Sequence, residues 1–306
     1  MIGSMTPRIR IGTREGLWEL DGDRVFSVET FAGKTLTALA AARASDWAIV
    51  DGRTLWESAG SSWSQRAAVD DHAATCLALT RDGLWVGTEE AHLFRLADDR
   101  LKRIEAFETV DGRAAWYTPW GDPADVRSIS VAVDGAVYVN VHVGGVVRSR
   151  DAGRTWTPTV DIEMDVHQVL AHPSRAEVVL AAAAEGFGVS HDGGASWRFV
   201  TDGMHAHYLR AVAASDDTVL VSASTGPGGR RAALYRGRLD ALAFERCDDG
   251  LPQWFGDNVD TGCLAASGAL FVAGTEDGHV FRSLDGGRRW DVAAKGLPPI
   301  TAIVLR

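Results

Sequence analysis

The chain has 306 residues, of which 46% are hydrophobic, and a formal net charge of -10 at pH 7. This acidic balance argues against nucleic acid or an anionic membrane as the main partner, because both carry negative charge. The length is enough for two average domains, although all-β folds often use it for one.

The N-terminal segment has no apolar region of the kind found in secretory signal peptides, and no stretch approaches the roughly 18 apolar residues of a spanning helix. Cys76, Cys247 and Cys263 have no metal-type spacing, so we predict that they are small buried residues. These features favour a soluble, cytoplasmic protein and leave export of the natural protein open.

Strands rich in small residues recur along the chain, at residues 37–41, 75–79, 128–132, 168–172, 210–214, 262–266 and 301–305. After the first six, a turn and further β-rich segments follow. Internal periods of about 40 to 45 residues are typical of β-propellers, in which small side chains suit the innermost strand around a crowded channel. The pattern predicts an all-β protein with seven blades of four strands each.

The two ends of the chain complement one another. Residues 8–13 read as a second strand without its first, and residues 300–305 read as a first strand without its second. Pairing them closes the ring and removes a free sheet edge. We therefore predict one domain, residues 1–306, with approximate blades at 300–306 with 8–28, 35–67, 74–107, 126–158, 166–200, 209–247 and 260–293.

An eight-residue pattern, Ser-x-Asp-x-Gly-x-x-Trp, occurs three times, and a worn remnant lies at residues 56–63. An Asp side chain can accept hydrogen bonds from backbone N–H groups just ahead of it, and Gly takes the positive φ that such turns need. The pattern therefore predicts a structural turn. Its positions are Ser149, Asp151, Gly153 and Trp156; Ser190, Asp192, Gly194 and Trp197; and Ser283, Asp285, Gly287 and Trp290.

This motif resembles the Asp box of bacterial-neuraminidase-type repeats, found in sialidases, sortilin-like receptors, xyloglucan-cleaving enzymes and a photosystem II assembly factor. The resemblance implies a turn between the third and fourth strands of a blade, on the face opposite the functional site. Sialidase activity is not expected, since residues 7–10, Pro-Arg-Ile-Arg, lack the Phe and the final Pro of the sialidase Phe-Arg-Ile-Pro segment.

The longest insertion, residues 107–125, lies on the predicted functional face and carries Trp116, Tyr117 and Trp120. Exposed aromatic side chains suit stacking on a sugar ring or a flat organic ligand, although they could also fold the loop over the channel. Trp254 lies in a second long loop with the same ambiguity. With Glu185 and Tyr208, these four aromatic residues form the predicted ligand-binding set.

Histidines and carboxylates gather on the same face. His142, His167 and His207 could hold a divalent metal or supply acid and base groups. Asp165 and Asp260 are the candidate catalytic carboxylates.

Three hypotheses follow. The protein is a ligand-binding or assembly propeller with a small-molecule, carbohydrate or protein partner; an enzyme acting on a glycoside or other small polar molecule; or a metal-dependent hydrolase or lyase. No cofactor is required by the first two.

Overall fold

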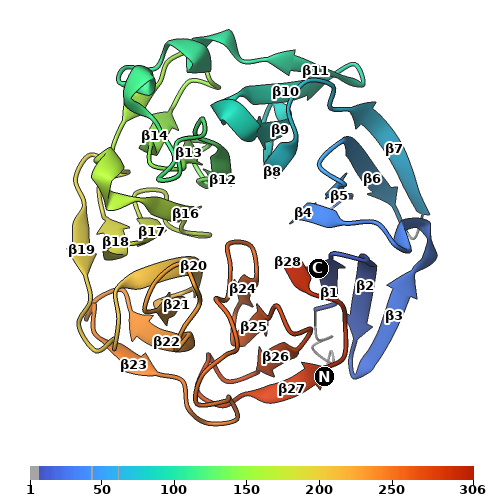
Figure 1. The fold of residues 1–306 in the computed structure, drawn as a ribbon, viewed down its shortest axis with the longest axis vertical. Coiled ribbons are helices and arrows are strands. Elements are labelled where there is room, and N and C mark those ends of the chain that lie inside the picture. Colours follow the sequence, from blue (N-terminus) through green and yellow to red (C-terminus); the bar gives the residue numbers. More distant parts are fainter. Residues whose placement is uncertain (1–6, 43, 61) are drawn as a thin grey trace.

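A computed structural model describes residues 7–42, 44–60 and 62–306. Its strands form seven four-stranded antiparallel sheets arranged in a ring (Figure 1). The predicted seven-bladed β-propeller is confirmed. None of the helices in the described ranges is long and apolar enough to cross a lipid bilayer.

Each blade has its first strand at the channel and its fourth at the rim (Figure 1). Blades one to three comprise β28 (Ile300–Leu305), β1 (Ile9–Thr13), β2 (Gly16–Asp21) and β3 (Arg24–Val28); β4 (Leu36–Ala41), β5 (Asp46–Val50), β6 (Thr54–Ala59) and β7 (Ser62–Ala68); and β8 (Ala74–Thr80), β9 (Gly83–Thr88), β10 (Leu93–Ala97) and β11 (Arg100–Arg103). Blades four and five comprise β12 (Val126–Val131), β13 (Val137–Val141), β14 (Gly145–Ser149) and β15 (Thr157–Pro158); and β16 (Val166–Ala171), β17 (Val179–Ala183), β18 (Gly186–Ser190) and β19 (Arg198–Val200). Blades six and seven comprise β20 (Tyr208–Ser215), β21 (Thr218–Ser224), β22 (Ala233–Arg238) and β23 (Phe244–Arg246); and β24 (Leu264–Ser267), β25 (Leu270–Gly274), β26 (Val280–Ser283) and β27 (Asp291–Ala294).

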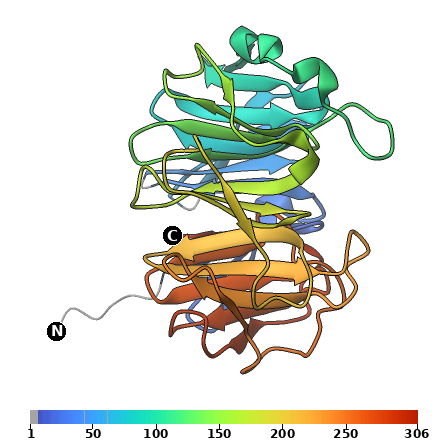
Figure 2. The same cartoon turned by 90° about the vertical axis from the view of Figure 1, so that its left-hand side faces the viewer.

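Short 3-10 helices interrupt the connections between these strands. They are η1 (Glu29–Phe31), η2 (Glu89–Ala91), η3 (Glu105–Thr109), η4 (Arg113–Ala115) and η5 (Ile162–Met164). In Figure 2 the chain from η3 to β12 projects on one side of the ring, while the C-terminal end lies on the other.

The C-terminal strand closes the ring as predicted. β28 pairs antiparallel with β1, with Ile9 opposite Leu305 and Ile11 opposite Ile303. A buried ion cluster reinforces the closure, because Arg10 of β1 and Arg306 both pair with the carboxylate of Asp46, which is 1% exposed. Asp46 begins β5, so the cluster ties the closing strands to the next blade.

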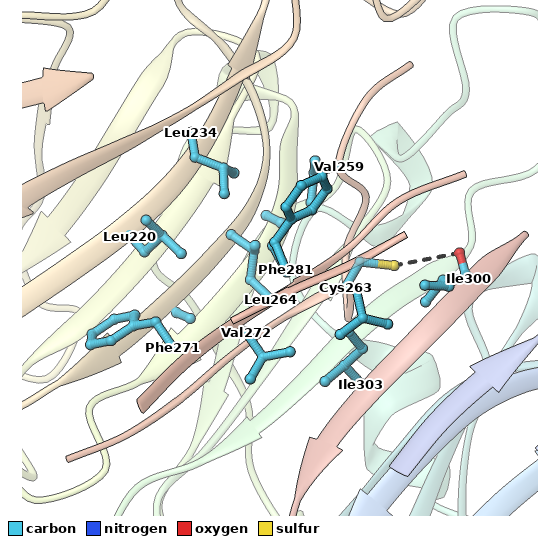
Figure 3. Close-up of a cluster of buried hydrophobic side chains, with 14 of the residues drawn as sticks. Leu220, Leu234, Val259, Cys263, Leu264, Phe271, Val272, Phe281, Ile300 and Ile303 are labelled. Carbon is cyan, nitrogen blue, oxygen red and sulfur yellow. Dashed lines mark hydrogen bonds between the residues drawn. The ribbon is translucent and has the colours of Figure 1, made fainter. Parts of the chain in front are cut away.

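The core lies between neighbouring blades and is built mainly from their first three strands. One cluster, shown in Figure 3, joins blades six, seven and one through side chains such as Leu220, Phe271 and Ile303. Cys263 contributes to it, and its thiol lies 3.7 Å from the carbonyl oxygen of Ile300. All three cysteines are free and buried, as predicted.

The three complete repeats of the Ser-x-Asp motif form the same turn between the third and fourth strands. In the first, Asp151 Oδ1 accepts hydrogen bonds from the backbone N–H groups of Arg154 (3.1 Å) and Thr155 (2.9 Å), and Ser149 Oγ accepts one from Gly153 (2.9 Å). The Thr155 hydroxyl also donates to Asp151 Oδ2 (2.6 Å), and this bond, followed by the one from the Thr155 N–H, lowers the pKa of Asp151 to about 2.

The turns also attach each blade to the preceding one. A Cβ on Gly153 would lie 2.9 Å from the ring of Trp85 in blade three, so glycine permits the close approach. Tyr138 of blade four donates a hydrogen bond to the carbonyl oxygen of Gly193 in the blade-five turn (3.1 Å). The motif thus has a structural role, as predicted, and lies at the opposite end of the blades from the turn at His142.

Candidate functional site

A cavity of about 580 Å³ occupies the mouth of the central channel on the face away from the Ser-x-Asp turns. Its wall combines the first strands of the blades with charged and aromatic side chains from the loops that connect strands. The polar and aromatic side chains that line it include Arg14, Trp120, Asp125, Arg127, His142, Arg210, Asp260 and Glu276. A volume of this size suits a sugar-sized ligand, since small-molecule sites span about 300 to 1,000 Å³.

Bulges in three first strands set the direction of three side chains near the cavity. The pairing register shifts between Val126 and Ser128 in blade four, between Val166 and Gln168 in blade five, and between Leu209 and Val212 in blade six. A bulge leaves a residue outside the regular ladder and redirects its side chain, a device common beside active sites. Arg127, His167 and Arg210 lie at or within these shifts.

Other blades carry threonine at the corresponding place. The register shifts there flank Thr37 in blade two and Thr75 in blade three, and both line the cavity. Thr75 Oγ1 donates to the carbonyl oxygen of Gly87 (3.1 Å), so it satisfies the backbone locally. Among the residues that the structure describes, charged or titratable ones therefore occupy the bulge only in blades four to six, on one side of the channel mouth.

The two arginines have different surroundings. Arg210 Nε lies 2.8 Å from Asp260 Oδ1, and its Nη1 donates to Tyr208 Oη (3.3 Å). Burial acts to lower the pKa of Arg210, but Asp260 and Tyr208 together outweigh burial and the pKa is raised. Arg14, a third arginine of the wall, pairs with Glu276 at 2.9 Å.

Arg127 is half-buried and, in the described part of the chain, has no carboxylate oxygen within 4.0 Å of its guanidinium. Its pKa falls to about 10, first because of burial and then because of the positive charge of Arg210. The group remains protonated at neutral pH. The cavity wall therefore presents a positive charge that no neighbouring side chain neutralises directly.

Beside the arginines, two imidazoles converge on Asp165. His142 Nε2 lies 3.7 Å from Asp165 Oδ1, and His167 Nε2 lies 3.5 Å from Asp165 Oδ2. Burial, followed by the charge of Arg127, lowers the pKa of His142 to about 4. Burial also lowers the pKa of His167, against the pull of Asp165.

The local backbone holds this group in place. Asp165 ends η5 in the left-handed region, at φ 43°, a conformation that is uncommon for a residue with a side chain. Its carbonyl oxygen accepts a hydrogen bond from Ala184 N (3.0 Å), and His167 Nδ1 donates to the carbonyl oxygen of Leu209 (2.6 Å). With Nδ1 donating to Leu209, Nε2 can donate to the Asp165 carboxylate only when the imidazole carries both ring protons.

The predicted catalytic carboxylates have different partners. Burial favours a raised pKa for Asp165, but its contacts with His167 and His142 outweigh burial and lower it. Asp260 is paired with Arg210. Asp165 is thus held in the ionised form, and Asp260 forms an ion pair, whereas a two-carboxylate glycosidase needs one protonated acid. The assignment of Asp165 and Asp260 as catalytic carboxylates stays a prediction.

The predicted metal set is only partly assembled. His142 and His167 share Asp165, but His207 is exposed and its Nδ1 lies 2.7 Å from the carbonyl oxygen of Ala184. Among the described residues, these three histidines do not bring ligand atoms within 4.8 Å of one another. Metal binding by this set stays a prediction.

The predicted aromatic set divides by location. Trp120 is 65% exposed, lines the cavity and lies 4.9 Å from His142 between ring centroids, and Tyr208 packs on His167 at 4.7 Å. Trp116 instead packs against Phe107 at 5.8 Å and supports the insertion.

The remaining predicted residues lie away from the cavity wall. Tyr117 is 41% exposed, and Glu185 is exposed in the turn between β17 and β18. Trp254 packs below the guanidinium of Arg246, at 4.0 Å, and against His205. Of the predicted residues, Trp120, His142 and Asp260 line the cavity. Asp165, His167 and Tyr208 lie next to it, because Asp165 contacts His142 and His167, and Tyr208 contacts Arg210.

No protein-family model matches the chain, and a comparison with curated proteins finds no match. Similarity to solved structures is extensive. A periplasmic gluconolactonase from Pseudomonas aeruginosa has a TM-score of 0.67 at 13% identity, with 98% of each chain covered. A structure described as YCF48 bound to D1 peptide has a TM-score of 0.55 at 13% identity, with 79% of each chain covered.

A GH74 xyloglucanase from Xanthomonas campestris has a TM-score of 0.61 at 17% identity. That match covers 94% of this chain and 46% of the xyloglucanase, so this chain spans about half of the enzyme's length. The fold is shared. At these identities the likeness shows the fold alone, and function has to be argued from the site.

Proposed function

We propose that the protein binds a small anionic ligand, bearing a carboxylate or a phosphate, in the cavity at the channel mouth. The observation that carries the proposal is Arg127, a half-buried guanidinium without a carboxylate partner among the described residues. Arginine is suited to such groups because its planar fork donates two parallel hydrogen bonds. Arg210 adds positive charge beside it.

Trp120 supports a ligand of sugar size. Its exposed ring lies at the cavity and next to His142, where it can stack on one face of a bound molecule. Binding propellers and hydrolases both occur among the structures similar to this one. The Ser-x-Asp turns support assignment to the Asp-box repeat class, with the ligand on the face opposite those turns.

Paired ligands test this proposal. Calorimetric titrations would compare glucuronate with glucose, glucose 6-phosphate with glucose, and a short peptide with its C-terminally amidated form. We expect measurable affinity only for the anionic member of a pair, and weakening with added salt because the main contact is a charge pair. Equal binding of neutral and anionic members would contradict the proposal.

Two variants localise the binding. Arg127→Gln removes the unneutralised charge and should weaken binding by about 10- to 100-fold, as expected for loss of charge-assisted hydrogen bonds. Arg154→Gln makes the same charge change at an exposed position of the blade-four turn and should leave affinity unchanged. Similar losses in both variants would point to nonspecific electrostatics.

A second candidate function, hydrolysis of a small ester, lactone or glycoside, is favoured by the convergence of His142 and His167 on Asp165. His142 lines the cavity, and its lowered pKa keeps the imidazole neutral at neutral pH, so a ring nitrogen can accept a proton from water. Chromogenic esters, lactones and glycosides test this function, with His142→Gln as the variant. Turnover that falls at least 100-fold in the variant would support hydrolysis; no turnover across the panel would leave binding as the function.

A further inference from the structure

A second cluster of ligand-type side chains lies in blade three, apart from the cavity. His72 precedes β8, and Glu90 and His92 lie in the connection between β9 and β10. Each of the three can offer one ligand atom, and these atoms all lie within 4.8 Å of one another. No other group of three or more His, Cys, Asp or Glu residues in the described ranges meets this condition.

We propose that His72, Glu90 and His92 form a binding site for a divalent transition metal ion of the zinc type. Two imidazole nitrogens and one carboxylate oxygen are a donor set that zinc accepts, and three protein ligands leave a fourth position open to a ligand. The inference is independent of the function proposed for the channel mouth.

The spacing of the donors is close to that of a metal site. His72 Nδ1 lies 3.7 Å from Glu90 Oε1, and the rings of His72 and His92 are 4.6 Å apart between centroids. Ligand atoms of a tetrahedral zinc site lie about 3.4 Å apart, given bonds of about 2.1 Å. Small side-chain rotations therefore suffice to close the site.

His92 has the second hydrogen bond that metal-binding histidines usually make. Its Nδ1 lies 2.9 and 3.0 Å from the two carboxylate oxygens of Glu108. With a proton on Nδ1, His92 donates a hydrogen bond to the Glu108 carboxylate, and Nε2 is then the nitrogen available to a metal. Arg113 Nη2 holds Glu108 in turn, at 3.0 Å.

The backbone brings the three ligands together before any metal binds. The N–H of Glu89 donates to the carbonyl oxygen of Ala73 (2.9 Å), and the N–H of Ala73 donates to Glu89 Oε2 (3.3 Å). These bonds clamp the residues next to His72 and Glu90 in sequence. Both loops are therefore fixed relative to one another.

The turn that carries Glu90 is strained. Glu90 and Ala91 are consecutive residues with side chains in the left-handed region, at φ 58° and 53°. Arg113 Nη1 donates to the carbonyl oxygen of Ala91 (2.8 Å), and Asp125 Oδ1 accepts from the N–H of Glu90 (3.1 Å). Such conformations persist where surrounding contacts impose them, and they cluster at functional sites.

Metal titration tests this site directly. Tag-free protein, stripped with a chelator and dialysed, would be titrated with Co²⁺ while its visible absorption is followed, and with Zn²⁺ in competition with a chromogenic chelator. We expect one ion per chain, with the absorption of four- or five-coordinate Co²⁺. Absence of zinc binding tighter than about 100 µM would overturn the proposal.

Variants identify the ligands. His72→Ala and His92→Ala should each weaken zinc binding at least 100-fold, and Glu108→Gln, which keeps every ligand, about 10-fold. His279→Ala removes a histidine that follows the corresponding turn of blade seven, and His167→Gln alters the channel-mouth cluster; both should bind zinc as the wild type does. Circular dichroism would confirm folding. Affinity unchanged in the His72 and His92 variants, or lost in His167→Gln, would refute the assignment.

Discussion

Acidification should destabilise the protein through His142. The side chain is 5% exposed, and its pKa is lowered to about 4, first by burial and then by the charge of Arg127. In an unfolded chain a histidine titrates near 6.5. Between about pH 6.5 and pH 4 the unfolded state therefore binds more protons at this position than the folded state does.

The free energy of unfolding must fall as the pH falls through that window, because protons favour the state that binds them. A shift of this size corresponds to about 3 kcal/mol in full, most of which is lost by about pH 4.5. The contribution is fully present above about pH 6.5. His167, whose pKa is lowered in the same direction, adds to the loss.

Urea denaturation near pH 7.5 and near pH 4.5 measures the effect. His142→Asn removes the titrating group, so this variant should lose less stability between the two conditions than the wild type, by about 2 to 3 kcal/mol. His191→Asn, at an exposed position of the blade-five turn, should keep the wild-type loss. An equal loss in wild type and His142→Asn would refute the reasoning about the cluster.

Three further predictions concern stability and binding. Asp46→Asn should lower the free energy of unfolding by about 3 kcal/mol or more, since it leaves Arg10 and Arg306 without their buried carboxylate. Asp23→Asn, which breaks an exposed ion pair, should cost less than about 0.5 kcal/mol in the same denaturation experiment. Trp120→Ala should change the free energy of unfolding by less than about 0.5 kcal/mol, because the side chain is exposed, and it should weaken anion binding several-fold by calorimetry. A large loss of stability would show that Trp120 serves folding instead. Asp151→Ala should lower the free energy of unfolding by about 1 to 2 kcal/mol through the lost turn hydrogen bonds. Its anion affinity should be unchanged, because the turn lies on the face opposite the cavity, and weakened binding would contradict that separation.

The fold could be predicted because its determinants are local and repeated. Each predicted innermost strand overlaps an observed one, from β4 at residues 36–41 to β28 at residues 300–305. The Ser-x-Asp motif marks turns after the third strand, because an Asp carboxylate and two backbone N–H groups close the turn within a few residues. These interactions need no knowledge of distant contacts.

The site was predicted in part. His142, Asp165 and His167 were expected on one rim, and they do converge. The two arginines were not predicted as site residues: Arg210 begins a predicted innermost strand, and Arg127 directly precedes another and lies in β12. Aligned repeats would have shown arginine, histidine and arginine in three adjacent blades where others have threonine.

Side-chain direction explains the remaining differences. A loop aromatic can cover a cavity or pack beneath the loop, and sequence alone does not choose between these places. Trp120 faces the cavity, while Trp116 packs on Phe107 and Trp254 packs against Arg246. The cytoplasmic location stays a prediction.

An experimental structure with a bound anion tests the central claim most directly. Crystals soaked in a brominated benzoate would locate the carboxylate through the anomalous signal of bromine. The account predicts the carboxylate within hydrogen-bond distance of the Arg127 guanidinium, beside Arg210 and below Trp120. A fully occupied anion on the face of the Ser-x-Asp turns, with none at Arg127, would contradict it.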